Sequence, residues 1–132
     1  MLTKQTKTLV RAVSLTALVS LGSLSQVALA DDAAATKTIA GVLAGLNHFP
    51  SADEKAALAA IASDEGNGMA VRALAGAVAG IQHAATAEGK AAMQQIVSSD
   101  MADAQAKALA EIVIGINHVP SAEAKATLQA ML

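Results

Sequence analysis

The apolar positions between residues 36 and 47 follow the spacing of one face of a helix. The large side chains recur at i, i+3, i+4 and i+7, namely Ile39, Val42, Leu43 and Leu46. At about 100° per residue, these positions fall on the same side of an α-helix. The pattern therefore predicts an amphipathic helix over residues 36–47.

A turn and a second helix are expected to follow. Pro50 cannot continue a helix, and it also restricts the residue before it. Ser51 is a preferred N-cap residue, and Glu54 stands three positions later, as in a capping box. The second helix should begin after Ser51, bury Leu58, and end near Asp64, just before a glycine-rich break.

This two-helix pattern occurs three times at intervals of 35 residues. Segments 45–61 and 115–131 align without a gap and share 10 of 17 residues, and a more divergent copy lies midway between them. We therefore predict an all-α domain over 31–132, built as a short α-solenoid or a compact helical bundle. It would consist of three tandem helical hairpins, with copies at 31–65, 66–100 and 101–132.

Glycines form a second stripe on the first helix of each copy. Gly41 and Gly45 lie opposite the large apolar residues, and Gly76 and Gly80 repeat this in the second copy. A helical Gly costs about 1 kcal/mol relative to Ala, so we expect close approach of the next copy at this face. Glu111 replaces the first Gly in the third copy, which predicts a terminal, capping role. On this interpretation, Gly80→Leu should open the fold.

The composition restricts how the domain is stabilised. The chain has no Cys, Trp or Tyr, and Phe49 is its single aromatic residue. Disulfides are excluded, and Ala, the strongest helix former, is the commonest residue. The core must therefore depend on close packing of helices rather than on large side chains.

Residues 1–30 have the pattern of a secretory signal peptide. An uncharged apolar stretch covers residues 12–24, and Ala28 and Ala30 occupy the small-residue positions of a cleavage site. The positive charges that precede the stretch are Lys4, Lys7 and Arg11. The segment predicts an exported protein, periplasmic or secreted, with no stable membrane anchor after cleavage.

Cleavage would leave an acidic protein. The full chain has 9 basic and 11 acidic residues, and loss of three basic residues leaves 6 against 11, a net charge of about −5. This balance argues against binding to nucleic acid and against adsorption to anionic lipid.

The three histidines occupy one repeat position, as His48, His83 and His118. Imidazole is the commonest metal ligand, which makes these residues a candidate metal site. Equivalent positions in stacked hairpins should, however, lie at least one helix layer apart, about 8–10 Å, too far for one ion with bonds of about 2.1 Å. We therefore expect a structural role at the end of each first helix. Metal binding and a pH-responsive row of histidines are the alternatives.

The hydroxyl residues Ser51, Thr86 and Ser121 follow the histidines at three positions' distance. A nucleophile and base could be arranged in this way, but each hydroxyl also precedes a predicted helix. Because a catalytic group is usually unique in a chain, three copies favour helix capping. We expect no enzymatic activity and no cofactor.

These observations favour a non-enzymatic exported helical-repeat protein that acts as a protein-interaction or self-assembly module, with a partner that the sequence does not identify. The alternative is a periplasmic metal-binding protein that uses His48, His83 and His118.

Overall fold

The computed structural model describes residues 32–132, and this part of the chain is entirely helical, with six helices and no strand. The predicted signal peptide, residues 1–30, lies outside the described residues and stays a prediction. No helix within 32–132 has the length and apolar character that crossing a bilayer requires.

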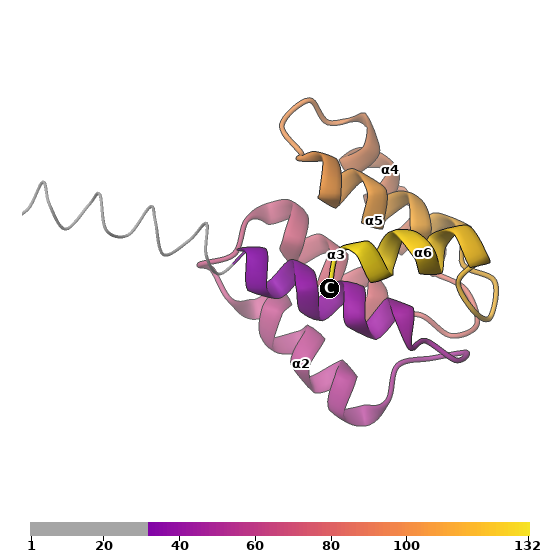
Figure 1. Cartoon of the computed structure of the whole chain (residues 1–132). Coiled ribbons are helices and arrows are strands. Elements are labelled where there is room, and N and C mark those ends of the chain that lie inside the picture. Colours follow the sequence, from indigo (N-terminus) through magenta and orange to yellow (C-terminus); the bar gives the residue numbers. More distant parts are fainter. Residues whose placement is uncertain (1–31) are drawn as a thin grey trace, which may run out of the picture.

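The helices alternate with short turns along the chain (Figure 1). The first covers residues 32–44 and so ends three residues before the predicted boundary. The others are α2 (Ala52–Ser63), α3 (Met69–Ala79), α4 (Ala87–Ser98), α5 (Ala104–Gly115) and α6 (Ala122–Ala130).

The predicted N-caps are confirmed. The Ser51 hydroxyl accepts a hydrogen bond from the Glu54 N–H at 3.2 Å, and the Glu54 carboxylate accepts one from the Ser51 N–H at 2.7 Å. Thr86 caps α4 and Ser121 caps α6 through the same hydroxyl contact with the third helical residue. These bonds satisfy backbone donors that a helix N-terminus otherwise leaves unpaired.

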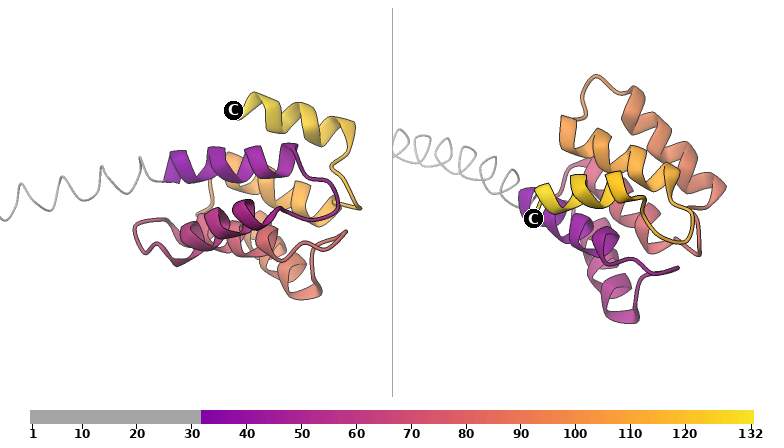
Figure 2. Two further views of the ribbon diagram at one scale, coloured as in Figure 1. Left: turned by 90° about the horizontal axis from the view of Figure 1, so that it is seen from below. Right: turned by 45° about the vertical axis from the view of Figure 1, so that its right-hand side comes forward.

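The helices form a closed, compact arrangement rather than an open row. α2 packs against α3, α4 packs against α5, and α3 also contacts α4 and α5. The views in Figures 1 and 2 place α6 beside the helix over 32–44. Leu132 Cδ2 lies 3.8 Å from the position that a Cβ would take on Gly41. Of the two predicted forms, the bundle is therefore the one observed.

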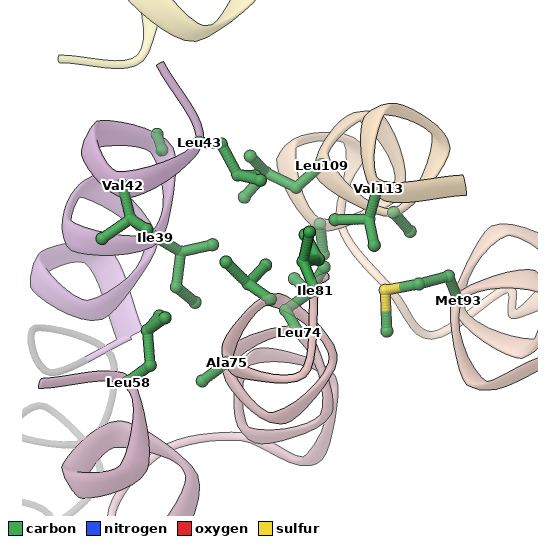
Figure 3. Packing of buried hydrophobic residues seen from close by; sticks show 14 of the residues in the cluster. Ile39, Val42, Leu43, Leu58, Leu74, Ala75, Ile81, Met93, Leu109 and Val113 are labelled. Atoms are coloured by element: carbon green, nitrogen blue, oxygen red, sulfur yellow. The ribbon is translucent and has the colours of Figure 1, made fainter. Parts of the chain in front are cut away.

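The core lies between the helix over 32–44, α3 and α5. Ile39, Leu74 and Leu109 are completely buried, and Figure 3 shows their side chains entering the space between these three helices. Leu58 on α2, Met93 on α4 and Leu128 on α6 are also completely buried. The predicted apolar face thus forms the core.

The expectation for the glycine face is wrong. A Cβ on Gly76 would have no neighbour within 4 Å, and one on Gly80 would meet only carbonyl oxygens of its own helix, the nearest at 3.6 Å. Glu111 is exposed, and the third copy is not terminal, because its end returns to the first helix. The copies meet through their large apolar residues, so Gly76 and Gly80 face solvent, and Gly80→Leu should not open the fold.

Gly76→Ala is expected to raise the free energy of unfolding by about 0.5–1 kcal/mol. The position is exposed inside α3 and has room for a methyl group, while Ala restricts the unfolded chain and favours helix. Urea denaturation measures the change. Gly68→Ala is the control, because its Cβ would lie 3.1 Å from Asp32 Oδ2 and should give no comparable gain. A loss of stability in Gly76→Ala would contradict the corrected view of this face.

Candidate functional site: the histidine triad

Each histidine lies at the centre of a tight turn. His48, His83 and His118 have φ values of 74°, 69° and 70°, and they are the non-glycine residues with positive φ within 32–132. In the first turn, the Phe49 N–H donates to the Asn47 carbonyl at 3.0 Å, across the histidine between them. Such three-residue turns with positive φ are rare and strained. All three turns nevertheless place their histidine at a similar positive φ.

A ring of backbone hydrogen bonds joins the three turns, which lie together at one end of the bundle (Figure 2, left). The His48 N–H donates to the His118 carbonyl at 2.9 Å, and the His83 N–H donates to the His48 carbonyl at 2.7 Å. The His118 N–H completes the ring by donating to the His83 carbonyl at 2.5 Å. Each histidine therefore gives one bond and accepts one, and the turns surround a common axis.

The three imidazoles form a close triangle on this axis. The ring of His48 lies 5.2 Å from that of His83 and 5.4 Å from that of His118, and the remaining separation is 5.0 Å, centroid to centroid. The expectation that these side chains lie a helix layer apart is therefore wrong. It assumed copies related by translation, whereas rotation about an axis brings equivalent residues near the axis together.

Two of the imidazoles are held by the preceding asparagine. His48 Nδ1 lies 2.7 Å from Asn47 Oδ1, and His118 Nδ1 lies 2.7 Å from Asn117 Oδ1. An amide oxygen only accepts hydrogen bonds, so the hydrogen in each of these two contacts belongs to Nδ1. The third turn differs: in the described structure, no side-chain hydrogen bond joins His83 to its neighbour Gln82.

The strained backbone is a reason to look for a role of the imidazole itself. A non-glycine residue in this region costs about 1–3 kcal/mol, and Gly or Asn would tolerate it better. The residue after each histidine varies, as Phe49, Ala84 and Val119, whereas the histidine is the same in all three turns. A strained residue that recurs unchanged beside variable neighbours favours a functional role for its side chain.

The triad lies at the surface beside exposed apolar side chains. His48 is half-buried, whereas His83 and His118 are exposed. Phe49 is 56% exposed and Val119 is 41% exposed. The Lys55 ammonium lies 5.7 Å from the centre of the Phe49 ring. The imidazoles are thus accessible to a ligand from solvent.

The side-chain orientations do not form a ready-made metal site. Among residues 32–132, no group of three or more His, Cys, Asp or Glu side chains is placed to hold an ion as it stands. The imidazole rings lie close together, but within 32–132 they do not form a set of metal ligands in their present orientations. The exposed imidazole of His83, to which no asparagine is bonded, can turn about its Cβ–Cγ bond, for which the preference is broad.

The other candidates lie elsewhere. The hydroxyls of Ser51, Thr86 and Ser121 accept backbone hydrogen bonds as caps, as predicted for a structural role. A cleft of about 330 Å³ between α5 and α6 contains Glu111 and Glu123 but no histidine. The sequence placed the three histidines at one repeat position, but it did not reveal that they meet.

Comparisons with protein-family models, with curated proteins and with solved structures give no match to this chain. The functional conclusion therefore depends on the geometry of the triad.

Proposed function

We propose that this chain is a non-enzymatic metal-binding protein whose three histidines hold one divalent cation, such as Zn²⁺, at the exposed end of the bundle. Metal binding, which the sequence left open as the alternative function, is therefore the function that we propose first. The observation that carries it is the triangle of imidazoles, His48, His83 and His118, on the axis shared by their three turns.

The size of this triangle fits a tetrahedral ion. With metal–nitrogen bonds of about 2.1 Å, and about 1.1 Å from a nitrogen to the centre of its ring, each ring centre lies roughly 3.2 Å from the metal. Three such ligands at tetrahedral angles place their ring centres about 5.2 Å apart. The separations here are 5.0, 5.2 and 5.4 Å. Binding then needs the imidazoles of His48 and His118 to turn together with the asparagine side chains bonded to them, without movement of the backbone.

The backbone supports this role by fixing the positions of the three histidine Cα atoms before an ion binds. The cyclic hydrogen bonds hold the three histidine backbones together before any ion arrives. This lowers the ordering cost of binding, because ligands from three distant parts of the chain are already assembled. In this proposal, the three 35-residue repeats of the sequence serve to place one side chain three times around an axis. Three protein ligands leave a coordination position open to water.

The predicted export of the protein would agree with this role. The predicted signal peptide would place the protein outside the cytoplasm, and the predicted charge of about −5 after cleavage favours cations over anions. Metal buffering or delivery in the periplasm or outside the cell is the activity that we propose.

Calorimetric titration of the purified protein with Zn²⁺ tests the proposal. We expect one ion per chain, and roughly 100-fold weaker binding when His48, His83 and His118 are all replaced by Asn. Asn tolerates positive φ, so the turns should still form. Glu111→Gln with Glu123→Gln, in the separate cleft, is the matched control and should leave binding unchanged. Equal affinity in the wild type and the triple variant would overturn the proposal.

A second candidate function is the protein-interaction or self-assembly module that the sequence favoured. The exposed side chains of Phe49 and Val119 beside the triad support it. Light scattering at rising protein concentration should then show association without metal, and Phe49→Ser with Val119→Ser should reduce it. A wild-type protein that stays monomeric at high concentration would count against self-assembly.

A further inference from the structure

We propose that Asn47 and Asn117 are positioning residues, which hold two of the histidines in the tautomer that binds metal through Nε2. The inference depends on the proposed metal site and adds to it the residues that prepare that site. It also predicts that the three ligands are unequal, because the middle turn has Gln82 in the place of the asparagines.

The chemistry of imidazole explains why a partner at Nδ1 matters. A neutral imidazole has one nitrogen with a hydrogen and one with a lone pair, and only the latter binds a metal. When an acceptor holds the N–H of a metal-bound histidine, it fixes the tautomer, orients the ring and raises the basicity of the other nitrogen. Asn47 Oδ1 and Asn117 Oδ1, each 2.7 Å from the adjacent Nδ1, are acceptors in the required place.

The turn itself places each asparagine side chain beside the imidazole of the next residue. Each directly precedes its histidine, and its backbone carbonyl accepts the hydrogen bond that closes the turn, at 3.0 Å in the first turn and 2.9 Å in the third. One residue therefore secures both the strained backbone and the imidazole. Neither histidine needs an acceptor from another helix, because the acceptor is the residue directly before it.

The middle turn lacks this arrangement. Gln82 is one methylene longer than Asn, and its side chain makes no hydrogen bond to His83 within the described structure, whereas its backbone N–H donates to the Ala84 carbonyl at 3.2 Å. His83 is consequently free to adopt either tautomer. Gln82→Asn should remove this difference and strengthen metal binding.

NMR of the metal-free protein tests the first half of the inference. Long-range ¹H–¹⁵N spectra distinguish the two tautomers of each histidine. We expect the Nδ1–H form for His48 and His118, and a mixture dominated by the Nε2–H form for His83. Asn47→Leu with Asn117→Leu should give all three histidines the behaviour of His83. An Nε2–H tautomer at His48 and His118 in the wild type would overturn the inference without involving metal at all.

Zn²⁺ titration of matched variants tests the second half. The double Leu variant should bind about 10–100-fold more weakly, and Asn47→Asp with Asn117→Asp should restore the wild-type affinity or exceed it, because a carboxylate also accepts from Nδ1–H. Gln82→Asn should bind more tightly than the wild type. Gln95→Leu, an exposed change on α4, is the control and should have no effect.

The outcomes separate the two proposals. If the wild type binds no Zn²⁺, the proposed function fails, while the NMR result still decides the role of the asparagines. If the wild type binds and the double Leu variant binds equally well, only the positioning role fails. Asp variants that bind as weakly as the Leu variants would show that the amide nitrogen, not the oxygen, faces the imidazole, and would also overturn the inference.

Discussion

Leu74→Ala is expected to lower the free energy of unfolding by about 2–5 kcal/mol, one of the largest effects available in this chain. Leu74 is completely buried in α3, and its side chain points toward Ile39 and Leu109 from the two neighbouring helices (Figure 3). Removing it creates a cavity at the place where three helices meet. The core consists mainly of Leu, Ile and Val side chains rather than of Ala, and these are themselves buried in their own places. Urea denaturation followed by circular dichroism measures the loss.

Met69→Ala is the matched control for this experiment. Met69 begins the same helix but is 86% exposed, so its truncation should change stability by no more than about 0.5 kcal/mol. A Leu74→Ala variant that loses less than about 1 kcal/mol would show that the three helices do not converge on this residue.

The local structure was predictable because it depends on neighbouring residues. Ser51 and Glu54 form the capping box that their spacing indicates, and α2 ends at Ser63, next to the predicted boundary at Asp64. The apolar stripe that includes Ile39 became the core, since a helix can bury only the face on which its large residues lie.

The arrangement of the copies was not predictable from the same signals. A 35-residue period is compatible with copies related by translation, and it is equally compatible with copies related by rotation around an axis. The distance between His48 and His118 depends on that choice, and the translational assumption gave the wrong answer. The deciding contact, the His48 N–H donating to the His118 carbonyl, joins residues far apart in the sequence and leaves no local pattern.

The glycines were misinterpreted for a related reason. A small residue in a helix permits close approach, but it does not require it. Gly76 has no neighbour within 4 Å of an added Cβ, so its presence reflects an exposed position rather than a contact. Likewise, the strained conformation of His83 could not be anticipated, because His has no sequence signal that separates a helix end from a turn with positive φ.

The ring of backbone hydrogen bonds leads to the other large prediction: His83→Pro should lower the free energy of unfolding by about 3 kcal/mol or more. Proline has no N–H, so the 2.7 Å bond to the His48 carbonyl is lost. Proline also fixes φ near −65°, whereas this position has φ of 69°. Both effects act where all three turns meet, so the substitution should destabilise the packing of all three copies. Thermal and urea denaturation measure it.

Two further variants separate these causes. His83→Gly keeps the N–H and tolerates positive φ, so it should remain close to the wild type in stability. Ala85→Pro inserts proline two residues later, where the other turns have Pro50 and Pro120, and should be neutral or stabilising by about 0.4–1 kcal/mol. If His83→Pro unfolds at the same urea concentration as Ala85→Pro, the ring does not hold the copies together. The three histidines would then not be held together by the backbone before metal binds. If only His83→Pro loses stability, the stability of the whole bundle depends on the turns that present the histidines.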